Sequence, residues 1–297
     1  EIVPCDWSSD VCSSDLTCTV LYPYASGYST VQVMQWIKTR LRELSYTQID
    51  TVFDNPFVSQ ITTSLNRGAS IFAYRGIYGM SGWSVGNTLS LANTWELPFC
   101  VIITCDTGSF QNGYSRSEAF LRAGTATSPR GGIGCVGSAT TGTHTRFNNC
   151  YTFGVYDGLL YQQAWEMGAA HTWGKLNLWR NYAYTEYGAV VRFSYWNNLM
   201  GDPAAEIWTA APRSLVVSHP ATLPIGSNLL PVEVSSDGVP CKGALVCLYQ
   251  PGSPGVQVVG RTDANGRAGL AIAGLAPGPA QLTVSRHDHL PFLAEVA

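Results

Sequence analysis

Between residues 17 and 212, short apolar runs alternate with helical patterns, and this alternation limits the folds open to the chain. The longest unbroken apolar run, residues 99–103, is far too short to cross a bilayer and is typical of a buried strand. Met34, Ile37 and Leu41 recur at the spacing of one face of an amphipathic helix. This alternation predicts an α/β domain over residues 17–212, with a mostly parallel sheet and helices on both faces.

The same patterns give approximate positions for the individual elements. The strands expected in this domain are residues 19–21, 49–53, 70–74, 99–105, 132–137 and 207–209. The helices expected begin near Ser29 and after Pro56, and span residues 115–123, 156–167 and 173–182.

The pattern changes after Pro212, where helical periodicity stops. Short β-type runs follow one another, separated by Gly, Pro, Asp and Asn, and DANG at residues 263–266 is a turn signal between two of them. Closely spaced strands without helices predict an immunoglobulin-like β-sandwich over residues 213–297.

Composition narrows the class of protein. Hydrophobic residues make up 45% of the chain and charged residues 12%, which is typical of a folded extracellular protein. The net charge of −3 and the absence of a basic run give no reason to expect nucleic acid or a membrane surface as partner. The nine cysteines show no zinc-like spacing, so we expect no metal and no cofactor, and the odd count leaves at least one free thiol. No pattern indicates an oligomeric state.

The first sixteen residues have an unusual composition. The segment DWSSDVCSSDL, residues 6–16, resembles the translation of a sequencing adapter fused to a metagenomic reading frame. We expect residues 1–16 to be an artefact, with the native chain beginning near Thr17 and its original N-terminus and signal peptide lost. The alternative is a short Ser/Asp-rich linker.

Two loops contain residues suited to catalysis. In a parallel sheet, the turn after residues 70–74 and the turn containing Cys105 both lie at carboxyl ends of strands, where such sheets bind ligands. Cys105 leaves a buried strand and enters a turn containing Gly108, which brings a thiol close to free backbone N–H groups. Nucleophilic catalysis needs that combination. A buried structural cysteine is the alternative.

The two loops also resemble a known family. The segments that carry the resemblance are YRGIYGMSGW (residues 74–83), LPFCVIITCDTGSF (97–110), EAFLRA (118–123), VGS (136–138) and GDP (201–203). Their residues and spacing are similar to those of the gingipain-type cysteine peptidases. The resemblance covers the chain from about residue 70 to its C-terminus.

The resemblance implies a caspase-like catalytic domain followed by an immunoglobulin-like domain. It also implies a secreted endopeptidase, located extracellularly or at the cell surface, that cleaves protein or peptide substrates. Cys105 is the implied nucleophile. The implied active-site loop residues are Arg75, Gly76, Ile77, Trp83 and Gly108.

One position departs from the family pattern. The general-base histidine is expected where this chain has Ile77, and the glycine after it is Tyr78. No histidine occurs between Thr17 and Thr143. Isoleucine cannot accept a proton, and losing general-base help typically costs about 10²–10⁴-fold in rate.

Few other residues in the chain are suited to replace this base. Arg75 favours a thiolate electrostatically but cannot act as a base. His144, in the loop after the strand 132–137, is a possible replacement, although an exposed loop histidine is the simpler interpretation. His171 is expected at a helix end or on the surface. Asp106 beside the cysteine would disfavour the thiolate. The three remaining histidines are expected to face solvent in the second domain: His219, His287 and His289.

Two further patterns have ordinary structural explanations. GIGCVG at residues 132–137 fits a dinucleotide-binding motif, but the run itself is predicted to be a strand. The aromatic side chains between residues 165 and 196 are compatible with a carbohydrate platform, but their helical spacing favours core packing. This expectation covers Trp165, Trp173, Trp179, Tyr182, Tyr184, Tyr187 and Trp196.

Two functional hypotheses follow. The first is a secreted cysteine endopeptidase that acts through a thioester at Cys105. The second is a catalytically inactive relative that binds peptides or acts as an adhesin-like surface module. Ile77 favours the second hypothesis, and the intact Cys105 turn favours the first. A histidine or carboxylate bonded to Cys105 would indicate an enzyme, whereas an apolar lining would indicate a binding protein.

Overall fold

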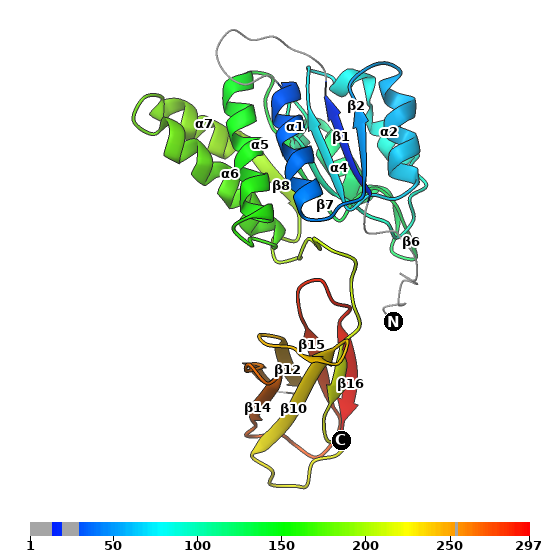
Figure 1. Ribbon diagram of the computed structural model, residues 1–297, viewed down its shortest axis with the longest axis vertical. Coiled ribbons are helices and arrows are strands. Elements are labelled where there is room, and N and C mark those ends of the chain that lie inside the picture. Colours follow the sequence, from blue (N-terminus) through cyan, green and yellow to red (C-terminus); the bar gives the residue numbers. More distant parts are fainter. Residues whose placement is uncertain (1–13, 20–29, 253–254) are drawn as a thin grey trace. The chain divides into compact units, whose positions relative to one another are not determined.

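The computed structural model describes residues 14–19, 30–252 and 255–297. The chain divides into two compact units, Glu1–Ala210 and Ala211–Ala297, which are described separately below. Figure 1 shows an α/β unit and a unit built only from strands.

The first unit is built on a six-stranded mixed sheet with the order β2-β1-β3-β4-β7-β8. Neighbouring strands run parallel except for the last pair, in which β8 is antiparallel to β7. The strands are β1 (Ser14–Thr19), β2 (Gln48–Val52), β3 (Ile71–Arg75), β4 (Phe99–Ile102), β7 (Gly134–Ser138) and β8 (Asn197–Gly201). A separate two-stranded hairpin joins β5 (Gly124–Thr125) to β6 (Ser128–Pro129).

Helices cover both faces of this sheet (Figure 1). In β3, Ile71 and Ala73 belong to the core under α1, α5, α6 and α7, while Phe72 and Tyr74 belong to the core on the opposite face. Both sets are fully buried, because successive side chains of a strand point to opposite faces. The helices are α1 (Thr30–Glu43), α2 (Phe57–Asn66), α3 (Val85–Leu89), α4 (Arg116–Arg122), α5 (Thr145–Leu160), α6 (Met167–Tyr182) and α7 (Tyr187–Trp196), with short 3₁₀ turns η2 (Met80–Gly82) and η3 (Phe110–Asn112).

The sequence predicted the α/β class correctly but misplaced several elements. One helix was expected at residues 156–167, whereas the structure has α5 ending at Leu160 and α6 beginning at Met167. Residues 207–209 are not a strand, since only an isolated bridge forms there, between Glu166 and Glu206. Strand β8 was not anticipated, because its side chains are mostly half-buried and lack a clear alternation.

Strand β1 begins at Ser14, within the segment expected to be an artefact. It pairs with both β2 and β3, so residues 14–16 take part in the sheet. The rest of that segment, and residues 20–21 of the expected first strand, lie outside the described residues.

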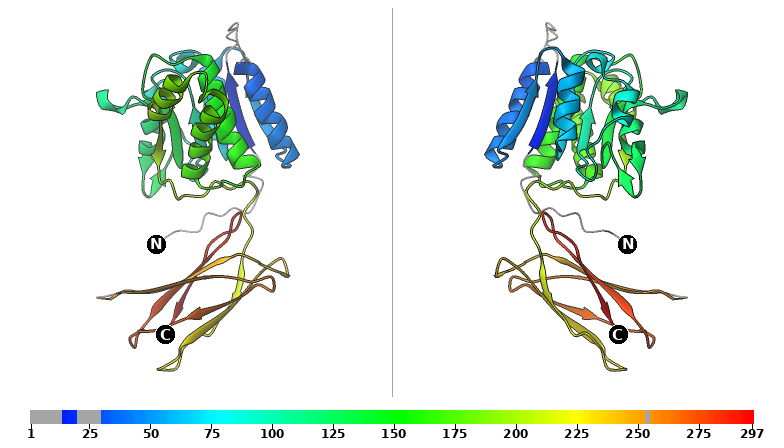
Figure 2. Two further views of the ribbon diagram at one scale, coloured as in Figure 1. Left: turned by 90° about the vertical axis from the view of Figure 1, so that its left-hand side faces the viewer. Right: turned by 90° about the vertical axis from the view of Figure 1, so that its right-hand side faces the viewer.

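The second unit contains two four-stranded sheets with antiparallel pairing (Figure 2). Alternate residues point inward along its strands, as in β10, where Leu230, Val232 and Val234 are buried. The two sheets share one apolar core. The strands are β9 (Val216–Ser218), β10 (Leu229–Ser236), β11 (Val239–Pro240) and β14 (Arg267–Ala271) in one sheet, and β12 (Leu245–Gln250), β13 (Val256–Arg261), β15 (Ala280–Ser285) and β16 (Phe292–Val296) in the other.

Within the described ranges, none of the helices combines the length and apolar character needed to cross a membrane. The same residues contain no group of three or more His, Cys, Asp or Glu side chains arranged to hold a metal ion.

Candidate active site around Cys105

The candidate site lies where three neighbouring parallel strands end. Strands β3, β4 and β7 are adjacent in the sheet, and Tyr74, Ile102 and Gly137 are matched in register near their carboxyl ends. The loops that leave these strands therefore meet at one edge of the sheet. Cys105 lies in the loop after β4, at the kind of position where open α/β sheets place their ligands.

The loop that carries Cys105 is tied firmly to the sheet. The Thr107 hydroxyl donates to the Ile102 carbonyl over 2.7 Å and accepts from the Ser138 N–H over 3.0 Å. Asp106 has a left-handed backbone with φ of 62°, and its N–H donates to the Thr140 carbonyl over 2.8 Å. These contacts end β4 at Ile102 and turn the chain so that Cys105 is only partly buried.

Gly108 allows this loop to pass close to β7. A Cβ atom at Gly108 would lie 2.8 Å from the carbonyl carbon of Gly137. The Gly108 N–H also donates to the Ser138 carbonyl over 2.9 Å. Glycine is required here by the close approach of the two backbones.

The Cys105 sulfur contacts a hydroxyl. Its Sγ atom lies 2.9 Å from Thr143 Oγ1, in the loop after β7. Thr143 Oγ1 in turn accepts a hydrogen bond from Asn148 Nδ2 over 2.9 Å. In the described part of the chain no histidine or carboxylate is hydrogen-bonded to this sulfur, and no acceptor is bonded to the Cys105 backbone N–H.

Arg75 places a buried positive charge beneath the site. Its side chain is 1% exposed, its Nε donates to Asn149 Oδ1 over 2.9 Å, and its guanidinium also donates to the Ile103 carbonyl. Burial lowers the pKa of Arg75 to about 10, against the opposing influence of Tyr74 and Cys105. At that value the group remains protonated at neutral pH, so Cys105 experiences a permanent cation.

The loop after β3 is joined to the Cys105 loop. Thr104 Oγ1 donates to the Gly76 carbonyl over 2.9 Å. Ile77 is the next residue in the chain after this hydrogen-bonded glycine. Ile77 is 37% exposed and presents an apolar side chain at the surface. A Cβ atom at Gly76 would collide with the hydroxyl of Tyr74, so a larger residue at this turn would displace that side chain.

The structure does not bring Trp83 to the surface of the site. Trp83 is fully buried, and its Nε1 donates to Thr88 Oγ1 over 2.8 Å within the core on the α4 face. The structure therefore joins the loop of Arg75, Gly76 and Ile77 to the loop of Cys105 through the Thr104–Gly76 hydrogen bond, whereas Trp83 lies in the core.

The histidines do not supply an obvious base. His144 is the N-cap of α5, directly after Thr143, and its Nδ1 accepts from the Arg146 N–H over 3.2 Å. His171 was expected at a helix end or on the surface, but it is buried within α6 and bonded to the Tyr151 hydroxyl. Burial, followed by the charge of Lys175, lowers its pKa to about 4.

Two other expectations from the sequence were wrong. His289 in the second unit is 3% exposed rather than solvent-facing, because its ring packs inward with Nδ1 against the His287 carbonyl. Three of the aromatic residues expected in the core, Trp179, Tyr184 and Tyr187, are more than half exposed. Helical spacing places side chains on a common face but does not decide whether that face is covered.

The GIGCVG run is not a phosphate-binding turn. Its last four residues, starting at Gly134, lie in β7, and Cys135 and Val136 are fully buried.

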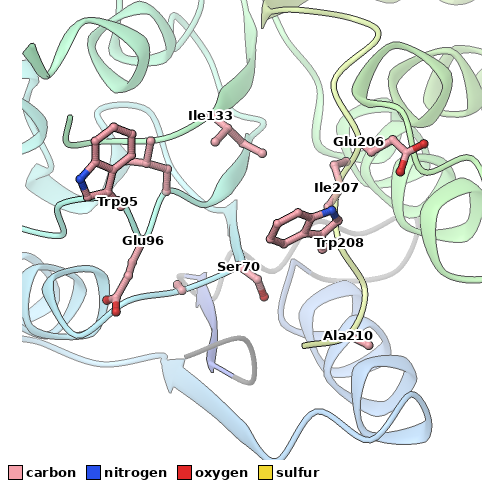
Figure 3. Close-up of a pocket in the computed structure, with 10 residues that line it drawn as sticks. Ser70, Trp95, Glu96, Ile133, Glu206, Ile207, Trp208 and Ala210 are labelled. Atoms are coloured by element: carbon pink, nitrogen blue, oxygen red, sulfur yellow. The ribbon is translucent and has the colours of Figure 1, made fainter. Parts of the chain in front are cut away.

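Cys105 does not line either of two cavities in the first unit. One, of about 570 Å³, lies between α1, α5 and α6 and is lined by Arg146, Asn149 and Asn177 among others. The other, of about 230 Å³, lies at the opposite edge of the sheet, where Ser70, Leu97 and Ile133 precede β3, β4 and β7. Figure 3 shows its two tryptophans on either side of Ser70.

Sequence reasoning missed Thr143 and Asn148. Both are ordinary loop and helix residues far from Cys105 in the chain, 38 residues away in the case of Thr143. The pairing of β4 with β7 brings Thr143 to the sulfur, and Asn148 reaches the site through its hydrogen bond to Thr143. A weak signal was available, because Thr143 follows the predicted strand at its carboxyl end.

Comparisons with known proteins agree with this architecture. The sequence model described as peptidase family C25 matches residues 18–208, which is more than half of the chain. None of the curated protein sequences matches this chain.

Solved structures of similar fold span both units. The crystal structure of the Arg-specific cysteine proteinase gingipain R (RgpB) has a TM-score of 0.85 and 19% identity, over 98% of this chain and 67% of that one. The complex of the pro- and mature domains of RgpB from Porphyromonas gingivalis has a TM-score of 0.82 and 20% identity, over 95% and 68%. A structure described only as a protease has a TM-score of 0.78 and 16% identity, over 97% and 68%. The family match, together with a cysteine at the carboxyl edge of a mixed α/β sheet, shows that the chain belongs to peptidase family C25, the gingipain-type cysteine peptidases.

Proposed function

We propose that this protein is a secreted cysteine peptidase that cleaves protein or peptide substrates with Cys105 as nucleophile and Ile77 in place of the family's general-base histidine. One observation carries the proposal. The Cys105 thiol is partly exposed on a rigid loop at the carboxyl edge of the sheet, in a member of a cysteine peptidase family.

The surroundings of Cys105 fit acyl transfer. Its backbone N–H has no acceptor among the described residues, so it can donate to the oxyanion of a tetrahedral intermediate. The buried guanidinium of Arg75 adds a positive charge that interacts electrostatically with Cys105. The sulfur attacks the scissile carbonyl carbon, the C–N bond breaks, the leaving amine takes up a proton from water, and water then hydrolyses the thioester.

The proposal extends to the rest of the chain. We propose an extracellular or cell-surface location and a catalytic domain over residues 17–212. Two antiparallel sheets around one core support an immunoglobulin-like assignment for residues 213–297.

A second candidate function is a peptide-binding module without catalysis, and Ile77 favours it. An exposed isoleucine at the expected base position offers an apolar contact and no proton acceptor.

The test is single-turnover hydrolysis of a mixed peptide library, with the protein in excess and Cys105→Ser as control. The peptidase proposal predicts cleaved peptides and an acyl adduct on Cys105 by mass spectrometry, both absent from the Ser variant. Peptides retained intact by both proteins would support the binding module and reject the peptidase.

A further inference from the structure

The contact between Cys105 and Thr143 assigns a role to two residues outside the predicted site. We propose that the Thr143 hydroxyl donates a hydrogen bond to the Cys105 thiolate and that Asn148 is the positioning residue that directs this hydroxyl. This inference rests on the proposed function and deepens it, because it names a group that stabilises the nucleophile, to which no histidine or carboxylate of the described residues is hydrogen-bonded.

The direction of the hydrogen bonds follows from the donors available. Asn148 Nδ2 donates to Thr143 Oγ1 over 2.9 Å and so occupies one lone pair of that oxygen. The single Thr143 proton is then free to point at Cys105 Sγ, which is 2.9 Å away. A thiolate sulfur can only accept, so the contact in the ionised state requires Thr143 to be the donor.

Asn148 is held so that it can direct Thr143. It lies in the first turn of α5, is 3% exposed, and its backbone N–H donates to the His144 carbonyl over 3.0 Å. Its Oδ1 atom is buried and has no hydrogen-bond partner among the described residues, so the one side-chain bond found for this buried amide is the bond to Thr143. A buried polar group with a single partner is costly to place, which is consistent with a role at the site.

Thr143 does not act as a base. A hydroxyl keeps its proton at neutral pH, so the Cys105 proton leaves to solvent and Thr143 stabilises the charge that remains. Hydrogen bonds to charged groups are roughly twice as strong as neutral ones. Such a donor raises the thiolate fraction near neutral pH but also makes the thiolate a weaker nucleophile, because nucleophilicity falls with basicity.

This combination gives a distinctive signature for Thr143→Val. We expect the pH of half-maximal Cys105 alkylation to rise by about one unit, which is a tenfold change in the ionisation equilibrium. The limiting alkylation rate at high pH is expected to rise by about threefold, from a Brønsted coefficient of about 0.4–0.5. A change that only disturbed the local structure would not raise both the pH of half-maximal alkylation and the limiting alkylation rate.

The experiment follows iodoacetamide labelling of the Cys105 peptide by mass spectrometry from pH 5 to pH 10. Thr143→Ser keeps the hydroxyl and is expected to retain the wild-type profile. Thr141→Val makes the same chemical change at an exposed position in the same loop and serves as the matched control. Asn148→Asp replaces the amide donor by an acceptor, which draws the Thr143 proton away from sulfur, and is expected to shift the profile in the same direction as Thr143→Val.

Circular dichroism and thermal unfolding check that each variant is folded. An unchanged profile in folded Thr143→Val, or an equal shift in Thr141→Val, overturns the inference. A shifted profile in a protein that hydrolyses no peptide supports this inference and rejects the proposed function, so the two failures are distinguishable. A Cys105 that is not alkylated at any pH in the folded protein overturns both.

Discussion

Restoring a histidine at position 77 is the sharpest perturbation of the proposed chemistry. Ile77→His places a group with an unperturbed pKa near 6.5 on the loop joined to the Cys105 loop through the Thr104–Gly76 hydrogen bond. Ile77 is 37% exposed and lies outside any helix or strand, so little apolar burial is lost. We expect the change to cost about 1 kcal/mol or less in the free energy of unfolding.

The expected gain in activity is large. General-base help typically contributes about 10²–10⁴-fold in rate, which corresponds to roughly 3–5 kcal/mol of transition-state stabilisation. The proposed site supplies the nucleophile, the oxyanion donor and the buried cation of Arg75, so a base is the part that Ile77→His adds. The rate should rise with pH as the new imidazole loses its proton, around its unperturbed value near 6.5.

The assay is kcat/KM for fluorogenic peptides between pH 5 and pH 9. Ile77→Asn is the matched control, because it is polar but cannot act as a base, and the double variant Ile77→His/Cys105→Ser reports background cleavage. If folded Ile77→His, with an alkylatable Cys105, cleaves no faster than Ile77→Asn, position 77 is not poised to serve the sulfur. The assignment of position 77 as the equivalent of the family's general-base histidine would then be refuted.

Three further predictions concern stability. Gly108→Ala should lower the free energy of unfolding, measured by urea titration, by about 1–3 kcal/mol, because the new methyl group would meet the Gly137 backbone. Gly142→Ala is the control: a Cβ atom there has no neighbour closer than 3.7 Å, so the substitution should be nearly neutral. The pKa of His171 is depressed to about 4 in the folded protein, so on acidification the unfolded chain binds a proton at this residue first. The contribution of the neutral, buried His171 to the free energy of unfolding is complete above about pH 6.5. Roughly 2–3 kcal/mol of it is lost as the pH falls to 4.5. Urea titrations at several pH values should therefore show a weaker acid dependence in His171→Phe than in the wild type, and equal slopes would contradict the prediction. Arg75→Met should cost roughly 2–4 kcal/mol by the same titration, since it removes two hydrogen bonds donated by a buried guanidinium. A stability equal to that of the wild type would show that these hydrogen bonds contribute nothing net.

Local sequence was sufficient where one element carries the information. The apolar run ending at Ile102 and the glycine at position 108 predicted a strand followed by a turn, and the structure has Cys105 in that turn. The helix beginning near residue 30 was also predicted, because Met34, Ile37 and Leu41 form one apolar stripe, and all three are fully buried.

Local sequence failed where burial depends on distant elements. His171 and Trp179 are both in α6, yet His171 is buried and Trp179 is half exposed. Helical periodicity groups such residues by face, but the packing of α5 against α6 decides which face is covered. His289 was also expected at the surface, because no local pattern around it indicates that the second unit buries it.

Local patterns in the chain were enough to predict the α/β class of the first unit, the family resemblance, Cys105 as the candidate nucleophile and Ile77 as the residue at the expected base position. These follow from periodicity and from motifs contained in single segments of chain. Only the tertiary structure decided what touches the nucleophile. Thr143 contacts the sulfur because β7 pairs with β4, and Asn148 in turn donates to Thr143. The buried Arg75 donates hydrogen bonds to Asn149 and Ile103. Such contacts join residues tens of positions apart, and their geometry is fixed by strand pairing and helix packing rather than by any local preference of the chain.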